Sequence, residues 1–205
     1  MRKSNKPLLV VLSSPSGGGK TVIASLLLRR HPEYSRSISI TTREKRKGEK
    51  EEVDYYFVDQ KDFQRKINRD EFVEWAKVFG DYYGTPKKSI LKTVGKIKVL
   101  LLVLDVQGGL TIKRKYPESV LIFILPPSLP ELKKRLVNRN TDRPDMIKRR
   151  LRTAIKEIEF CKKYDYLVVN KTLGETVELI ENIIIAEEHR AGKMFLDSFF
   201  KKNQI

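Results

Sequence analysis

The sequence has almost no cysteine and no long apolar run, and each shortage excludes a class of protein. Cys161 is the one cysteine in 205 residues, so an intrachain disulfide and a four-cysteine zinc site are both excluded. The longest apolar runs have six residues, against the roughly 18–20 that a membrane-spanning helix needs. We therefore expect a cytoplasmic protein with no membrane partner.

Acidic residues are fewer than basic ones. Lys and Arg number 42 against 26 Asp and Glu, which gives a net charge of +16. This sign favours anionic partners, namely nucleotides, nucleic acid or an acidic membrane surface. Apolar residues make up 40% of the chain, which is enough to build a core, so we expect a folded protein.

Short apolar runs alternate with longer segments of helical period along most of the chain. Buried strands are predicted at 8–12, 99–104, 120–125 and 166–169. Helices are predicted at 21–30, from a capping box at Ser128 towards Arg139, at 145–164 and from Gly174 to about Arg190. Helical spacing places Val22 and Ile155 on the buried faces of the first and third of these helices. The alternation indicates an α/β fold with a parallel sheet covered by helices on both faces.

Residues 38–95 break this alternation. They are rich in Thr, Arg, Lys, Glu, Tyr and Gly, with short strands predicted at 37–40 and 55–58 and a helix at 59–68. A further short helix is predicted to begin at Thr85–Pro86 and to end at Gly95. We interpret this stretch as an inserted subdomain.

Two further segments differ from the core in composition. A polar, arginine-rich stretch at 138–148 is typical of a mobile flap. The last residues, 191–205, carry apolar side chains at Phe195, Leu196, Phe199 and Phe200. Either a docked helix or an amphipathic end that binds a membrane or a partner would explain this pattern.

A glycine-rich loop follows the first predicted strand, and residues 8–21 read LLVVLSSPSGGGKT. A buried strand, such a loop, Lys-Thr and an amphipathic helix are together the context of a phosphate-binding loop. Gly17, Gly18 and Gly19 lack Cβ atoms, so their N–H groups can surround a polyphosphate, and the following helix adds its positive end. Lys20 can reach the β- and γ-phosphates, and the Thr21 hydroxyl can bind Mg²⁺.

Ser14 occupies the first glycine position of the pattern G-x-x-x-x-G-K-[ST], which is a departure from it. The alternative to a phosphate site is a flexible glycine turn before a helix. The lysine, the threonine and both flanking elements together favour the phosphate site. By itself, the loop indicates a nucleoside triphosphate and names no second substrate.

Three later segments carry a more specific pattern. They read SISITTREKRKGEKEEVDYYFV at 37–58, FVEWAKVFGDYYGT at 72–85 and VLLLVLDVQGG at 99–109. With the loop, they resemble guanylate kinase, a P-loop enzyme family that transfers a phosphoryl group from ATP to GMP, over residues 7–190. The resemblance implies a core at 7–37, 96–138 and 151–190, a mixed α/β GMP-binding subdomain inserted at 38–95 and a lid at 139–150. Residues 191–205 would form a basic C-terminal tail.

The resemblance also implies an acceptor site. It comprises Ser39, Arg43, Arg46, Tyr55, Glu74, Tyr83, Thr85 and Asp105. The arginines and tyrosines would hold the GMP phosphate, the carboxylates would face the guanine, and the hydroxyls of Ser39 and Thr85 would face its O6. Guanine presents N1–H and N2–H₂ donors beside O6, so a carboxylate matches it, whereas adenine has an acceptor at N1. The alternative for Glu74 is an exposed charge beside a packed Trp75.

The donor site that the resemblance implies comprises Ser14, Pro15, Ser16, Gly17, Gly18, Gly19, Lys20, Thr21, Arg135 and Asn170. Lys20, Arg43 and the lid arginines Arg139 and Arg150 would act as catalytic residues by neutralising charge, with Mg²⁺ bound beside Thr21. No general base is expected, since a GMP phosphate is largely dianionic near neutral pH. The chain departs from the family pattern at Val103, where a carboxylate is usual, and at Lys171 and Thr172.

Three other functions stay open at this stage. A guanylate-kinase-like module without catalysis would bind a phospho-ligand through the same arginines. A nucleic-acid binder would suit the net charge, but no array of stacking aromatics accompanies it, so no nucleic-acid partner is expected. A P-loop kinase for another small acceptor is the third. The oligomeric state, monomer or homo-oligomer, and the acceptance of dGMP beside GMP are left open.

Overall fold

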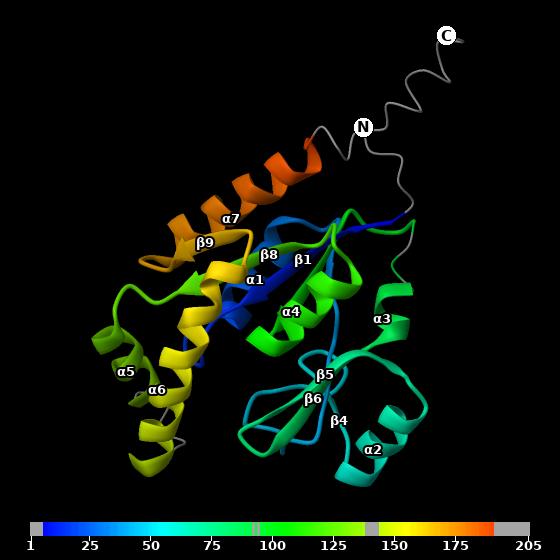
Figure 1. The fold of residues 1–205 in the computed structure, drawn as a ribbon. Helices are drawn as coiled ribbons and strands as arrows, with labels where there is room; N and C mark the ends of the chain where they lie inside the picture. The colour runs from blue at the N-terminus through cyan, green and yellow to red at the C-terminus, as the bar shows by residue number, and fades with distance from the viewer. Residues whose placement is uncertain (1–5, 92, 94, 138–143, 191–205) are drawn as a thin grey trace.

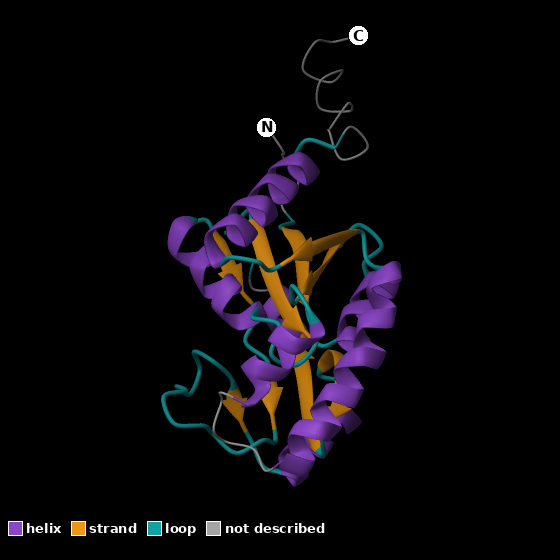
Figure 2. Cartoon of the chain, turned by 90° about the vertical axis from the view of Figure 1, so that its left-hand side faces the viewer, coloured by secondary structure: helices purple, strands orange, loops and turns teal. Residues whose placement is uncertain are grey.

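The structure is a computed structural model that describes residues 6–91, 93, 95–137 and 144–190. A five-stranded sheet lies at its centre with helices on either side, and a four-stranded sheet lies at one end of the molecule (Figures 1 and 2). The larger sheet has the strand order β2 (Tyr34–Arg36), β7 (Val99–Leu104), β1 (Leu8–Ser13), β8 (Val120–Leu125) and β9 (Tyr166–Val169). Every neighbouring pair in it is parallel, which confirms the predicted α/β fold.

The central strands are buried on both faces because helices cover each face. In β1, Leu8, Val10 and Leu12 belong to the core cluster that includes side chains of α1 (Lys20–Arg30) and α7 (Leu173–Glu188). Leu9 and Val11 belong to the opposite cluster, with side chains of α4 (Val106–Lys115). Burial on both sides explains why these strands form continuous apolar runs in the sequence.

The four predicted strands of this sheet are confirmed, and one strand was missed. β2 is a three-residue strand with two polar side chains, so it carries no apolar run. The helices α1 and α7 are confirmed, but Val22 of α1 is 51% exposed and Ala24 is buried instead. α4 was also missed, because glycines lie in its first turns at 108 and 109.

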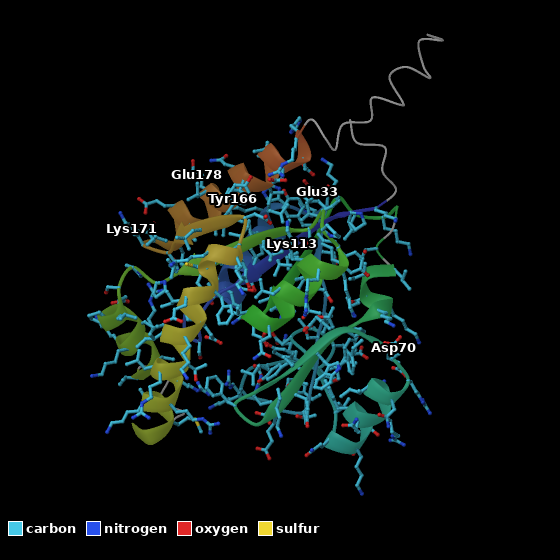
Figure 3. All side chains as sticks on the ribbon, in the orientation of Figure 1. Glu33, Asp70, Lys113, Tyr166, Lys171 and Glu178 are labelled. Atoms are coloured by element: carbon cyan, nitrogen blue, oxygen red, sulfur yellow. The ribbon has the colours of Figure 1, made fainter. Side chains whose placement is uncertain are left out.

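The smaller sheet is formed within the segment that connects β2 to β7. Its strand order is β4 (Tyr56–Phe57), β3 (Ile40–Thr41), β6 (Asp81–Pro86) and β5 (Phe72–Val78), and it is accompanied by α2 (Gln60–Asn68) and α3 (Lys87–Leu91). Ile40, Phe63 and Phe72 form a separate small core. An ion pair between Lys87 and Asp70 lies on the outer side of this part, where Figure 3 labels Asp70.

The predictions for this segment were wrong in three places. Residues 37–39 form no strand, and β3 begins at Ile40. Thr85 and Pro86 belong to β6, and the helix that follows ends at Leu91. The hairpin of β5 and β6 was missed because Val73 and Glu74 are both buried, beside an irregular register between Phe72 and Glu74. This irregularity removes the alternation that predicts a strand.

A pair of helices covers one side of the phosphate loop. α5 (Leu129–Val137) and α6 (Pro144–Glu159) pack together through Leu132, Leu136 and Ala154, and a 3₁₀ turn (Phe160–Lys163) follows α6. Ile155, which was expected on the packed face, is 44% exposed. Residues 138–143, which include Arg139, and the tail at 191–205 lie outside the described residues. Within the described residues, no helix combines the length and the apolar character needed to cross a bilayer.

Candidate active site

One cleft, with a volume of about 250 Å³, lies between the carboxyl ends of β1 and β7, the smaller sheet and α6. It brings together most of the residues that the sequence predicts for a site. Those that line it are Ser14, Ser16, Gly17, Gly18, Gly19, Lys20, Thr21, Ser39, Arg43, Arg46, Tyr55, Glu74, Tyr83, Asp105 and Arg150. Pro15, Thr85, Arg135 and Asn170 do not line it, and Arg139 lies outside the described residues.

The phosphate loop occupies one side of this cleft, and glycine is required at its end. Gly19, which precedes α1, has a φ of 96°, and a Cβ atom there would lie 2.8 Å from the Asn170 amide nitrogen. Ser14, in place of the pattern's first glycine, is 2% exposed, and its hydroxyl donates to the carbonyl of Pro15 at 3.0 Å. Its φ is not positive, so this position does not need glycine.

Asn170 lies behind the loop and not in the cleft. Its side chain is 2% exposed; its amide nitrogen donates to the Gly18 carbonyl at 3.0 Å, and its amide oxygen accepts from the Thr176 hydroxyl at 3.1 Å. A guanidinium nitrogen of Arg135 lies 3.5 Å from the carbonyl oxygen of Asn170. Asn170 therefore holds the backbone of the loop in place. Lys171, at the turn between β9 and α7, is labelled in Figure 3.

The opposite side of the cleft holds a buried carboxyl group. Glu74 is 6% exposed, and its Oε1 accepts a hydrogen bond of 2.5 Å from the Thr85 hydroxyl, which is fully buried. Burial raises the pKa of Glu74 to about 7, and the nearby negative charge of Asp105 adds to the rise. A Cβ atom at Gly108 would lie 2.6 Å from Glu74 Oε2, so glycine allows the carboxylate to approach this closely. Trp75, the next residue, points outward and is 48% exposed.

Asp105 both caps a helix and lines the cleft. Its carboxylate accepts a hydrogen bond of 2.9 Å from the Gly108 N–H and so caps α4. The same side chain lines the cleft. Thr85, which was expected to face the ligand, instead positions Glu74 from behind.

An ion pair holds one of the two arginines that the sequence predicts for the acceptor site. Arg43 donates two hydrogen bonds to Glu49, at 2.7 and 2.9 Å, and its guanidinium carbon lies 5.5 Å from the centre of the Tyr55 ring. Glu49 also accepts from the backbone N–H of Arg46 at 2.9 Å. Burial lowers the pKa of Arg43, but Glu49 and Tyr83 outweigh it, so the net pKa is raised and the arginine stays charged. Burial raises the pKa of the Tyr55 hydroxyl, which stays protonated.

Sequence reasoning assigned no role to Glu49, although it lies in the segment 37–58 that carries both arginines. Both of its carboxylate oxygens accept from one guanidinium nitrogen of Arg43, and both side chains line the cleft. The spacing was the available signal, since a carboxylate three residues after Arg46 can turn back onto the same loop.

Glu157 is a second residue that the sequence analysis missed. It lies on α6 and lines the cleft, and its Oε2 is buried without a hydrogen-bond partner. Burial raises the pKa of this carboxyl group, while Lys20 and the backbone N–H of Ser16 act against the rise. Glu157 follows Arg150 by seven residues, which is two helical turns, so it shares the face of α6 that carries Arg150. That spacing was the signal that could have identified it.

The donor set of this cleft fits a magnesium ion that arrives with a nucleotide. Among the described residues, no group of three or more His, Cys, Asp or Glu side chains could hold a metal by itself. Magnesium in nucleotide sites is held by phosphates and water together with one or two protein groups. Here Thr21 lies in the first turn of α1, and Glu157 supplies a buried oxygen without a partner.

Three comparisons with known proteins agree with this geometry. The family model described as guanylate kinase matches residues 6–187. Guanylate kinase of Clostridium perfringens is 42% identical over 95% of this chain and 90% of its own length, and that of Myxococcus xanthus is 47% identical over 91% and 90%.

The architecture also agrees with a solved structure. The crystal structure of guanylate kinase from Anaplasma phagocytophilum matches with a TM-score of 0.82 and 38% identity, over 98% of this chain and 96% of that one. A family model that spans most of the chain, close relatives and a matching fold lead to one conclusion. The chain belongs to the guanylate kinase family.

Proposed function

We propose that this chain transfers the γ-phosphoryl group of ATP to GMP, giving ADP and GDP. The observation that carries the proposal is that a single cleft is lined by the phosphate loop and by a buried carboxyl group with two arginines. Relatives named guanylate kinase, which align over about nine-tenths of their length, support it.

The donor would bind along residues 14–21. Backbone N–H groups of the loop and the positive end of α1 would hold the triphosphate, and Lys20 would neutralise its β- and γ-oxygens. Asn170 would act through the Gly18 carbonyl, by keeping the loop in its binding conformation. Thr21 would hold the Mg²⁺ that accompanies ATP, and the bound ion would supply positive charge beside the phosphates. We assign to Glu157 a supporting place beside that ion and Lys20, where Val103 offers no carboxylate.

The acceptor would lie on the smaller sheet. Arg43, Arg46, Tyr55 and Tyr83 would hold the phosphate of GMP. An ionised Glu74 would accept hydrogen bonds from guanine N1–H and N2–H₂, and Asp105 and Ser39 would complete the polar contacts of the base. Adenine would leave the buried carboxylate facing a lone pair, which is a costly mismatch.

The chemistry asks for position and charge rather than for a general base. The second ionisation of a phosphate lies near pH 6, so the acceptor oxygen is already a nucleophile at neutral pH. Charge that develops on the transferred group would be neutralised by Lys20, Arg43, Arg150 and Arg139. Closing of the acceptor subdomain (38–95) and the lid (139–150) on the core would exclude water and align the two phosphates.

An acceptor screen tests this function. ADP formation would be measured with Mg²⁺ and ATP against GMP, dGMP, AMP, CMP and UMP. We expect turnover with GMP to exceed that with AMP, CMP or UMP by at least about a hundredfold. Tight GMP binding without ADP formation would indicate a binding module instead, and a higher rate with another monophosphate would indicate a different kinase.

A further inference from the structure

The tip of the hairpin between β5 and β6 carries a phenylalanine in an unusual backbone conformation. Val78 pairs with Asp81, so Phe79 and Gly80 form a two-residue turn. Both have left-handed backbones, with φ of 54° and 106°. Turns of this kind favour asparagine, aspartate or glycine, and a bulky side chain there is strained. The turn itself therefore does not explain Phe79.

The side chain of Phe79 makes a contact with the opposite side of the cleft. The guanidinium carbon of Arg150, on α6, lies 5.6 Å from the centre of the Phe79 ring. This distance is within the range of about 6 Å over which a cation is attracted to an aromatic face. Both side chains line the cleft.

The contact joins the two parts of the molecule that hold different substrates in the proposed function. The hairpin that carries Phe79 also carries Glu74 and Tyr83 of the acceptor site. The helix that carries Arg150 also carries Glu157, which lines the cleft together with Lys20 of the phosphate loop. A contact between hairpin and helix therefore ties the position of the arginine to that of the acceptor.

We propose that Phe79 is a positioning residue for phosphoryl transfer, whose ring holds the Arg150 guanidinium over the cleft. The proposal rests on the role of Arg150 in the proposed function. Phe79 acts through the arginine, so it should affect the rate of transfer more than the binding of either substrate. The contact needs an aromatic face, so tyrosine should replace phenylalanine and leucine should not.

Steady-state kinetics on four variants test the proposal. Phe79→Leu should lower kcat about threefold to thirtyfold, the effect of losing a cation–π contact, with KM for ATP and for GMP within about twofold. Phe79→Tyr should retain at least about half of wild-type kcat. In an Arg150→Ala background, Phe79→Leu should cause no further loss, because the ring then has no guanidinium to hold.

Phe160→Leu is the matched control. Phe160 lies 5.3 Å from the ammonium of Lys163 in a similar contact, and neither residue lines the cleft. This variant should keep wild-type kcat. Leucine is as bulky in a left-handed turn as phenylalanine is, so backbone strain is matched in Phe79→Leu, and thermal unfolding confirms that each variant is folded.

Three outcomes would overturn the inference: wild-type kcat in Phe79→Leu, an equal loss in Phe79→Tyr and Phe79→Leu, or losses that multiply in the double variant. The proposed function is tested separately by Arg150→Ala. Full turnover in Arg150→Ala would remove the role of the arginine itself. A loss in Arg150→Ala together with none in Phe79→Leu would remove only the role of Phe79.

Discussion

The two sides of the cleft are built from different groups. The phosphate loop presents backbone N–H groups on a glycine-rich chain, held from behind by Asn170. The side that we propose for the acceptor presents side chains, of which Glu74 is held by Thr85 and Arg43 by Glu49. Backbone groups bind any triphosphate equally well, whereas a buried carboxyl distinguishes one base from another. Changes on the loop side should therefore reduce turnover with every acceptor, and changes on the other side should alter the choice of acceptor.

Removal of the loop-side charge should produce the largest effect. Lys20→Ala is expected to reduce kcat by about a hundredfold to a thousandfold, because the charge of Lys20 would stabilise the phosphoryl group during its transfer. The measurement is ADP formation with GMP and dGMP, which should fall by the same factor. The exposed Lys88, outside the cleft, gives the control Lys88→Ala. Turnover within tenfold of wild type in a folded Lys20→Ala variant would contradict the role given to the loop.

Neutralisation of the acceptor-side carboxyl should act on GMP alone. Glu74→Gln is expected to lower kcat/KM for GMP by more than about tenfold, because an amide cannot accept from both guanine donors. KM for ATP should stay within about twofold of wild type. Glu178→Gln, on the outer side of α7 (Figure 3), is the control. Unchanged GMP kinetics in Glu74→Gln would show that the guanine lies elsewhere.

The pH dependence of GMP binding follows from the same group. Below its pKa of about 7, Glu74 is protonated in the free protein and can no longer accept both hydrogen bonds. KM for GMP should therefore rise as the pH falls from 8 to 6. In Glu74→Gln only the ionisation of the GMP phosphate, near pH 6, should remain. Identical pH profiles for the two proteins would contradict the assignment.

Substitution of Glu157 should reduce turnover less than the changes above, and it should act only on the binding of ATP and Mg²⁺. Glu157→Gln is expected to lower turnover about tenfold, the effect of losing one hydrogen bond to a charged group, and to raise the Mg²⁺ concentration at half-maximal rate. Calorimetry of ADP binding with and without Mg²⁺ gives a reading independent of turnover. Adding Val103→Asp should restore part of the loss. Equal Mg²⁺ dependence in wild type and Glu157→Gln would exclude this role.

The smallest expected effect is that of Glu74→Gln on thermal stability. The pKa of Glu74 is higher in the folded chain, at about 7, than the ordinary glutamate value of 4.5. A group of this kind stabilises the fold below about pH 4.5 and loses that contribution as the pH rises through about 7. Glu74→Gln stays neutral, so its Tm should exceed that of wild type by more at pH 8 than at pH 5. The reverse order would mean that Glu74 is stabilised as a carboxylate.

The central sheet and the phosphate loop could be predicted from the sequence because local residue patterns determine them. β7 and β8 are buried on both faces, so each forms an unbroken apolar run. The loop has a fixed spacing of glycines and Lys20. In contrast, β2 pairs with β7, which is distant in sequence, and the hairpin of β5 and β6 lacks a regular alternation because of its irregular register. Glu74 interrupts the apolar pattern of β5, and it lines the cleft.

The supporting residues of the site were harder to predict than the residues that line it. Thr85 and Asn170 were identified by resemblance as direct contacts, yet both are buried and hold other groups. Glu49 and Glu157 each follow a predicted arginine at a short spacing, but that spacing alone does not show that their side chains reach the cleft. Such spacings are common, so the three-dimensional arrangement is needed to show which side chains position another.

The most direct test of the account is a crystal structure of the chain with GMP, ADP and Mg²⁺. The account predicts guanine N1 and N2 within hydrogen-bond distance of the Glu74 carboxylate, the GMP phosphate on Arg43 and Arg46, and the ADP phosphates on the loop at 14–21. A guanine that lies away from both Glu74 and Asp105 would contradict it.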